Sequence, residues 1–304
     1  MQYSQVLDTV RPIEGMWTAD VSDQWAQGRT IFGGLQAAIA MRAMRGLIPL
    51  SVPLRVLQTS FIAPVPPGPI HIEANVLRMG KSVLHAEARI LDRGHTACLV
   101  VGTFGQSRHS MIDIQLPRPD APPAEEGASM PYIEGVLPRF VEHMTMRWSP
   151  EVTIFTGATK PKTQIYVGFR DEPYAGPGVL GEAQIIGYAD TIPSPGLSLV
   201  NQPTNASSLS WTLEMLTDDC GPARKGLWHH GCRGGIGAGR LFEPERRAVE
   251  PGGEAHRAES TERGDIRLRK GRWREYGDPR LFFCSVAAGR PFATSSTIAL
   301  SARR

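Results

Sequence analysis

The feature that most constrains the fold is a helix with almost no polar surface. Phe32-Gly33-Gly34 is followed by the run LQAAIAMRAMRGLIP, which is apolar on nearly every face of an α-helix. Such a helix is stable only where other elements surround it. We therefore expect a fold in which the rest of the chain buries this helix.

Strand-like segments lie around this helix in the sequence. Their bounds are 16–21, 56–65, 70–79, 83–91 and 96–106. The last four are separated by short turns at Pro-Pro-Gly, Gly80 and Asp92-Arg93-Gly94. Short turns favour an antiparallel meander, which we expect to curl around the helix.

The same order of elements recurs further along the chain. Residues 162–171 alternate like a strand, and Gly181 opens a second apolar helix that runs through Tyr188. Residues 207–216 then predict a strand that matches 56–65. A repeated order of strand, helix and strand indicates an internal duplication.

The last quarter of the chain differs in composition from the rest. Residues 232–304 hold 14 arginines, and the net charge changes from −3 over residues 1–230 to +6 over residues 231–304. A GC-rich gene read out of frame gives such a composition, and we favour a frameshift near Gly231 over a genuine basic tail. We expect this tail to be disordered, because it offers little patterned apolar surface.

These observations predict four regions. Residues 1–116 form the first copy, and residues 117–131 form a proline-rich, polar and extended linker. Residues 132–230 form a second copy that lacks two or three strands, and residues 231–304 form the out-of-frame tail.

Composition also restricts the protein's location and partners. No apolar run reaches the roughly 20 residues that span a bilayer, and the N-terminus has no secretory signal, so we expect no membrane partner and a cytoplasmic protein. The positive surplus lies in the suspect tail, so we expect no nucleic-acid partner. His229, His230 and Cys232 have no second pair of ligands at suitable spacing, so we expect no metal and no cofactor.

At this point several segments resemble a known family. GRTIFGGLQAAIAMRAM, GYADTIP and SSLSWTLEML are similar to the acyl-CoA thioesterase II type of the double-hotdog thioesterase-like superfamily, and the resemblance covers about residues 10–230. It implies an α+β double hotdog, in which an antiparallel sheet wraps a central helix in each half and the second hotdog is incomplete. It also implies acyl-CoA as the substrate, hydrolysis to free acid and CoA, and a homodimer.

The resemblance also implies catalytic residues. Members of that family hold a water with an aspartate late in the second helix, a serine or threonine on the next strand and a glutamine on the last strand. Asp190 matches the first position and Ser208 the second, with Ser207 as the acceptable neighbour. No residue of this chain matches the glutamine, so we expect an impaired enzyme. The alternative is a non-catalytic acyl-CoA-binding or inactive hotdog protein.

The residues themselves support part of this assignment. Asp190 follows an apolar helix at the end where the helix dipole is unfavourable to a carboxylate, which favours a function over helix stability. The alternative is a solvent-facing residue before a turn, and a serine on a strand, such as Ser208, is often only a surface residue. We predict that Gly33, Gly34 and Gly181 bind substrate, because glycine leaves room for a ligand beside the free N–H groups of a helix N-terminus.

Overall fold

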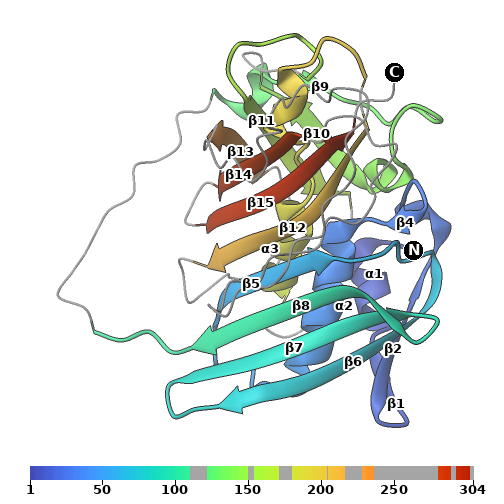
Figure 1. Cartoon of the computed structure of the whole chain (residues 1–304), viewed down its shortest axis with the longest axis vertical. Helices are drawn as coiled ribbons and strands as arrows, with labels where there is room; N and C mark the ends of the chain where they lie inside the picture. The colour runs from blue at the N-terminus through green and yellow to red at the C-terminus, as the bar shows by residue number, and fades with distance from the viewer. Residues whose placement is uncertain are drawn as a thin grey trace, which may run out of the picture.

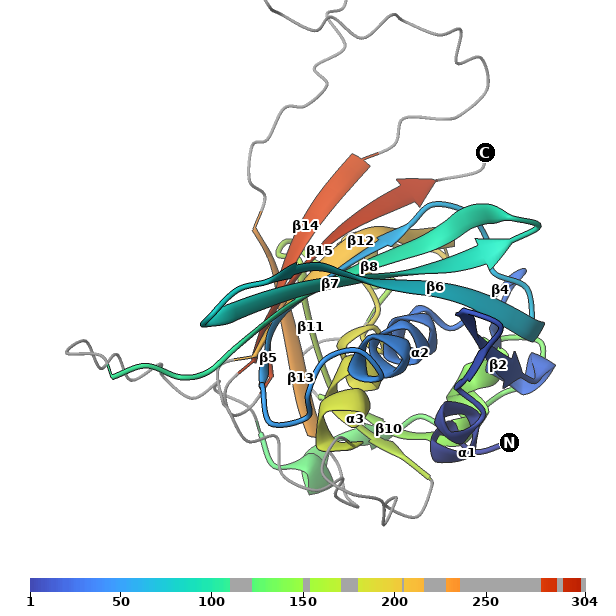
Figure 2. The same cartoon turned by 90° about the horizontal axis from the view of Figure 1, so that it is seen from below.

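A computed structural model gives the fold of this protein. It describes residues 1–109, 122–149, 154–170, 180–203, 205–215, 228–235, 280–288 and 292–301. Its main feature is one 13-stranded antiparallel sheet that curls around two helices (Figures 1 and 2). Both helices therefore lie on the concave side of the sheet.

The first half is built around helix α2 (Gly33–Arg45), and every residue of α2 except Arg42 is buried. The strands that wrap it are, in sheet order, β2 (Met16–Val21), β6 (Gly68–Met79), β7 (Val83–Asp92), β8 (His95–Gly105) and β5 (Leu54–Phe61). The expected buried helix and the meander around it are confirmed.

The second half repeats this order around helix α3 (Leu180–Ala189). Its strands, again in sheet order, are β11 (Lys162–Phe169), β13 (Trp228–Gly235), β14 (Arg280–Ala288), β15 (Phe292–Ser301) and β12 (Asn205–Met215). The two halves join where β5 pairs with β12, with Ser60 opposite Ser210. Each half thus has the same arrangement of helix and strands, as the internal repeat predicts.

The prediction that the second half lacks strands is wrong. β13 pairs with β11 and β14, and β15 pairs with β14 and β12, so the sheet is continuous through the second half. The arginine-rich composition hid two segments, 280–288 and 292–301, that are short, rich in strand-forming residues and almost free of arginine. The expected disorder of 231–304 is therefore wrong for the described segments 231–235, 280–288 and 292–301. Residues 236–279 lie outside the described residues, and the frameshift itself stays a prediction.

The expected linker is also corrected at its C-terminal end. β9 (Ala128–Ser129) pairs with β10 (Met144–Trp148), which in turn pairs with β11. The end of the predicted linker therefore forms the outer edge of the second half, and residues 110–121 lie outside the described residues. At the opposite edge, β1 (Arg11–Ile13) pairs with β2.

Short elements complete the described fold. They are α1 (Tyr3–Asp8), the hairpin of β3 (Ala26–Gln27) and β4 (Thr30–Ile31), and the 3-10 turns η1 (Asp23–Trp25), η2 (Ala124–Glu126), η3 (Arg139–His143) and η4 (Pro195–Ser198). The Tyr3 hydroxyl donates to the Ala183 carbonyl at 2.7 Å, and its ring stacks on Phe169 at 4.1 Å between centroids. The N-terminal helix therefore packs on the second half.

The two central helices lie side by side and antiparallel (Figure 2). Gly34, near the start of α2, meets Gly187 near the end of α3, while Arg45 at the end of α2 bonds Glu182 near the start of α3. The helix pair consequently has two ends of equivalent construction. Each end joins the start of one helix to the finish of the other.

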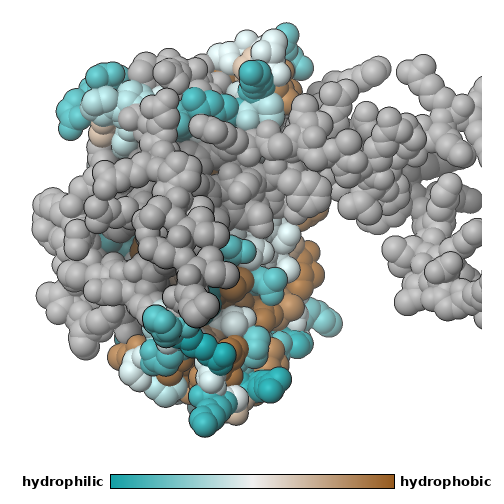
Figure 3. All heavy atoms as spheres, turned by 90° about the vertical axis from the view of Figure 1, so that its left-hand side faces the viewer, coloured by the Kyte–Doolittle hydropathy of each residue, from teal (hydrophilic) through white to brown (hydrophobic). Residues whose placement is uncertain are grey.

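Exposed apolar side chains of the first half gather near the turn between β6 and β7, at Val76, Leu77, Met79 and Val83. Figure 3 shows hydrophobic and hydrophilic surface interspersed over the lower part of this side of the molecule. Strand register places this turn near Leu54, at the opposite end of β5 from Phe61.

Among the described residues, no helix is long and apolar enough to cross a membrane.

Candidate active site

The first end of the helix pair depends on two glycines. A Cβ atom at Gly33 would collide with Asp190 Oδ2 and with the Phe61 ring, and one at Gly34 would collide with the Gly187 carbonyl. Glycine is therefore required here so that the start of α2 can approach the finish of α3. Gly33 also lines a cleft, whereas Gly34 serves the contact between the helices.

Asp190 follows the last residue of α3 and is half-buried. Burial of its carboxyl group raises its pKa to about 7, and hydrogen bonds from Ser208 and the Gly34 N–H oppose that shift. The Gly34 N–H belongs to the first turn of α2, where the helix dipole favours negative charge. A carboxyl group with a pKa near 7 is suited to accept a proton at neutral pH.

Ser208 lies on β12, the strand that follows α3 in the chain, and its hydroxyl donates to Asp190 Oδ1 at 3.5 Å. The register of β12 against β15 shifts between Ser208 and Ser210, which marks a bulge beside this contact. Bulges commonly redirect a side chain next to a functional site. The structure thus brings Asp190 and Ser208 together, and Ser207 lines the same cleft.

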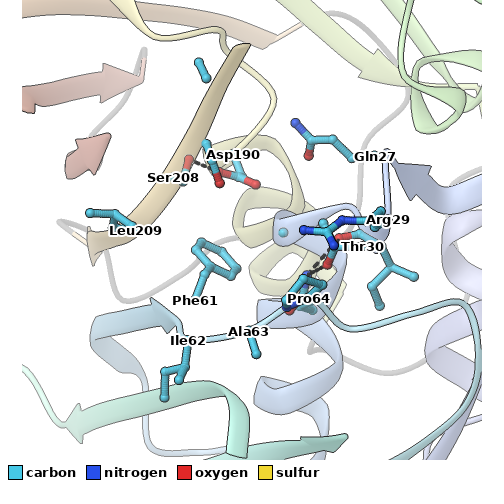
Figure 4. A pocket seen from close by; sticks show the side chains of 15 residues that line it. Gln27, Arg29, Thr30, Phe61, Ile62, Ala63, Pro64, Asp190, Ser208 and Leu209 are labelled. Atoms are coloured by element: carbon cyan, nitrogen blue, oxygen red, sulfur yellow. Dashed lines mark hydrogen bonds between the residues drawn. The ribbon is translucent and has the colours of Figure 1, made fainter. Parts of the chain in front are cut away.

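The cleft beside Asp190 has a volume of about 400 Å³ (Figure 4). Its lining residues are Gln27, Arg29, Thr30, Ile31, Gly33, Gln36, Phe61, Ile62, Ala63, Pro64, Asp190, Ala206, Ser207, Ser208 and Leu209. Both halves contribute, because the lining comes from the start of α2, the end of β5, the end of α3 and β12. Gly181, predicted to bind substrate, is not part of this lining and lies near the other end of α3.

Several residues of the cleft, among them Gln36, Phe61 and Arg29, are not predictable as site residues from the sequence alone. Gln36 belongs to the predicted apolar helix and Phe61 to the predicted strand 56–65, and neither pattern assigns them a site. Gln36 is the only uncharged polar side chain in the run that follows Gly33-Gly34, and that isolation was the available signal. Phe61 and Arg29 carried no such signal, because only the folded chain shows which strand ends and loops adjoin a helix N-terminus.

Cys98 lies near the site but is not suited to act as its nucleophile. It pairs in register with Phe61 and is fully buried. Burial raises the pKa of its thiol well above the ordinary value, and the negative charge of Asp190 raises it further. Because the thiolate is the reactive form, the neutral Cys98 side chain acts as core packing.

The second end of the helix pair is closed by a buried ion pair. Arg45 Nε and Nη2 donate to the two carboxylate oxygens of Glu182 at 3.0 and 2.7 Å. Arg45 Nη1 donates to the carbonyls of Pro49 and Val52, and its guanidinium lies 4.8 Å from the centroid of the Phe104 ring. Burial raises the pKa of Glu182, while Arg45 opposes the shift. The Arg45 guanidinium therefore donates its hydrogen bonds to Glu182, Pro49 and Val52, all groups of the protein itself.

Solved structures share the whole architecture. A hot dog fold protein of unknown function from Alicyclobacillus acidocaldarius aligns at a TM-score of 0.72 and 15% identity, with 99% of this chain and 98% of that chain covered. The fold is a double hotdog. An acyl-CoA thioesterase II from Mycobacterium marinum aligns at a TM-score of 0.66 and 15% identity, covering 99% and 98% of the two chains. The expected α+β fold class is confirmed.

A sequence-family comparison adds evidence about the first half. Residues 21–105 match the family model of the acyl-CoA thioesterase N-terminal domain. The matched segment extends from the end of β2 to the end of β8, so it contains α2 and the meander around it. No curated protein sequence matches the chain significantly. The chain thus has the double-hotdog fold, and residues 21–105 resemble the acyl-CoA thioesterase N-terminal domain.

Proposed function

We propose that this protein hydrolyses acyl-CoA thioesters to a free acid and CoA, with Asp190 as the general base. The observation that carries the proposal is a carboxyl group with a pKa of about 7, placed at a cleft between the first turn of α2 and the Ser208 hydroxyl. The family match over residues 21–105 supports the thioester chemistry.

The proposed reaction needs no covalent enzyme intermediate. Asp190 takes a proton from a water molecule as the water oxygen attacks the thioester carbonyl carbon, the carbon–sulfur bond breaks, and the leaving thiolate receives the proton. Ser208 holds the carboxylate in place through its hydrogen bond. The positive end of the α2 dipole stabilises the charge that develops on the carbonyl oxygen.

The cleft lining fits both parts of an acyl-CoA. Apolar side chains of Phe61, Ile62 and Leu209 offer contacts for an acyl chain. Arg29 is exposed and is the cationic residue among those that line the cleft, so it attracts the negatively charged CoA group. A long-range attraction of this kind speeds the encounter with the substrate and weakens at high ionic strength.

We expect slow turnover, because a glutamine is absent from the last strand. The sequence holds no glutamine after Gln202, and β15 places Ala299 and Ile298 opposite Ser207 and Ser208. Loss of one group that orients a reactant in a preorganised site costs on the order of a hundredfold in rate. This absence also favours the second candidate function, a hotdog protein that binds acyl-CoA without hydrolysing it.

Release of free thiol from a medium-chain acyl-CoA separates the two functions. Hydrolysis by the purified chain that Asp190→Asn abolishes supports the enzyme. Binding measured by calorimetry, with no release above that of Asp190→Asn, supports the binding protein. Sequencing the gene across the codons for 228–233, and assaying a version in the shifted frame, tests whether the tail lowers the activity.

We also propose that the protein is cytoplasmic and homodimeric. Both statements follow from the sequence and the resemblance. Fractionation of the source cells tests the first. Sedimentation of the purified chain tests the second, and a single monomeric species at micromolar concentration would contradict the dimer.

A further inference from the structure

Gln36 is a buried glutamine on α2, one helical turn after Gly33, and it lines the cleft. Residues three apart on a helix lie on the same face, so Gln36 lies on the face that meets Asp190. Only 2% of Gln36 is exposed. It is therefore a buried polar side chain in the lining of the cleft that also contains the proposed base.

The orientation of its amide is fixed by two hydrogen bonds. Nε2 donates to the Ile31 carbonyl at 2.8 Å and to Thr30 Oγ1 at 3.1 Å. Because the Ile31 carbonyl can only accept, the nitrogen rather than the oxygen of the amide must face it. Thr30 is itself held, since its hydroxyl oxygen accepts from the Val65 N–H at 3.0 Å. The amide oxygen is thereby directed away from β4.

That oxygen, Gln36 Oε1, is buried and has no hydrogen-bond partner among the described residues. A buried acceptor without a donor costs about 1–3 kcal/mol, so native proteins rarely leave one unsatisfied. Two polar groups that line the same cleft do not supply the donor. The Ser208 hydroxyl donates to Asp190, and an ionised Asp190 carboxylate has no proton to give. A donor from outside the described residues, such as a water molecule in the cleft, would satisfy this oxygen.

We infer that Gln36 Oε1 and the Asp190 carboxylate together hold the water that attacks the thioester. This inference rests on the proposed function. A water molecule has two protons, and attack is favoured when both are directed to acceptors so that a lone pair faces the carbonyl carbon. Asp190 receives the proton that is transferred, and Gln36 accepts a hydrogen bond from the proton that stays. The water oxygen then bonds to carbon as the carbon–sulfur bond breaks.

This arrangement gives the site an amide from the first half of the chain. The strand β15 offers no glutamine opposite Ser207 and Ser208. Gln36 comes instead from α2, while Asp190 directly follows α3, so the two groups proposed to hold the water come from the two halves. A water held by both is fixed at the contact between the halves, where Gly33 allows their close approach.

The test is Gln36→Met, which keeps the length of the side chain and removes its acceptor. We expect kcat for acyl-CoA hydrolysis to fall roughly tenfold to a hundredfold with KM changed less than about twofold, since the lost contact is to water rather than to substrate. Gln36→Glu keeps an acceptor but adds a like charge near Asp190, so the midpoint of its pH–rate profile should move upward.

Gln184→Met is the matched control, because Gln184 is a buried glutamine of α3 that does not line the cleft. It should lower stability without lowering kcat per folded molecule. A high-resolution crystal structure gives a readout that does not depend on turnover. It should show a water within about 3.2 Å of both Gln36 Oε1 and an Asp190 carboxylate oxygen, and that water should be lost in Gln36→Met.

Different outcomes separate this inference from the proposed function. Full kcat in Gln36→Met, together with a dead Asp190→Asn, overturns the role of Gln36 and leaves the thioesterase intact. A raised KM with unchanged kcat shows that Gln36 binds a donor of the substrate, which also overturns it. Absence of hydrolysis in the unaltered chain refutes the proposed function, and the crystal structure then decides whether the water is held.

Discussion

The two ends of the helix pair use the same backbone plan for different purposes. At one end, Asp190 meets the first turn of α2 beside an open cleft, with a hydroxyl and an N–H as hydrogen-bond partners. At the other end, Glu182 lies in the first turn of α3 and is neutralised by Arg45. Burial raises the pKa of both carboxyl groups.

The difference shows what distinguishes a reactive carboxylate from a structural one. Glu182 has a bidentate cation, Arg45, which opposes the rise in pKa that burial causes. Asp190 has only neutral donors, so its protonation is balanced near neutral pH. The two carboxyl groups therefore differ in their partners, a cation for Glu182 and neutral donors for Asp190.

The largest expected effect is on stability at the closed end, which is the end of the helix pair that holds Arg45 and Glu182. Arg45→Ala leaves Glu182 buried without its cation and should lower the free energy of unfolding by about 3–5 kcal/mol. The double variant Arg45→Met with Glu182→Met should cost much less, because it removes both charges. Urea unfolding measures both. A loss below about 1 kcal/mol in Arg45→Ala would mean that the closed end is not stabilised by the pair.

The next effect is on catalysis at the open end, which is the end of the helix pair that holds Asp190 and the cleft. Asp190→Asn keeps the shape of the side chain but cannot take a proton, so kcat should fall by about a hundredfold or more. Binding of acyl-CoA should be retained, as measured by calorimetry. Asp20→Asn, which makes the same change at an exposed aspartate, is the control and should leave kcat unchanged. Equal rates for the two variants would remove Asp190 from the reaction.

Both the reaction rate and the stability should depend on pH through the Asp190 carboxyl group. The pKa of Asp190 is raised from 3.8 to about 7, and the base acts when deprotonated. Below pH 7, kcat/KM should therefore rise about tenfold per pH unit, and it should level off above pH 7. Stability should change in the opposite sense, falling as the pH rises from about 4 to 7, because the folded state holds a proton that the unfolded state releases. A flat rate profile between pH 5 and 8 would contradict the assignment.

The smallest effect concerns the hydroxyl at the open end. Ser208→Ala should reduce kcat only severalfold, since a water can replace a hydroxyl that orients a carboxylate. Ser207→Ala is the paired variant, because Ser207 lines the same cleft from the neighbouring position. A greater loss in Ser207→Ala than in Ser208→Ala would transfer the orienting role to Ser207.

Sequence predicted the open end better than the closed one. Asp190, Ser208 and Gly33 could be found because a carboxylate after an apolar helix and a glycine pair before one are unusual patterns, and a family resemblance gave them roles. The ion pair was missed because Arg45 and Glu182 are separated by 136 intervening residues, and each alone suggests a solvated residue. Gly181 was misplaced for a related reason, since sequence does not say which helix start faces the cleft.

The strands of the second half were missed for a different physical reason. Composition averaged over 231–304 is dominated by arginine and glycine, whereas strand formation depends on local runs of about nine residues such as 280–288. Sheet pairing also supplies hydrogen bonds from strands distant in sequence. β15 pairs with β12 and β14, and the sequence of 292–301 alone does not identify these partners.

The pairing of β5 with β12 joins the two halves within a single chain. In a symmetric dimer of identical hotdogs every substitution occurs twice, so a change that opened one helix end would open both. Fusion of the halves removes that constraint. One helix end can keep the ion pair that stabilises the molecule while the other acquires catalytic residues. A substitution at one end then has no identical copy at the other.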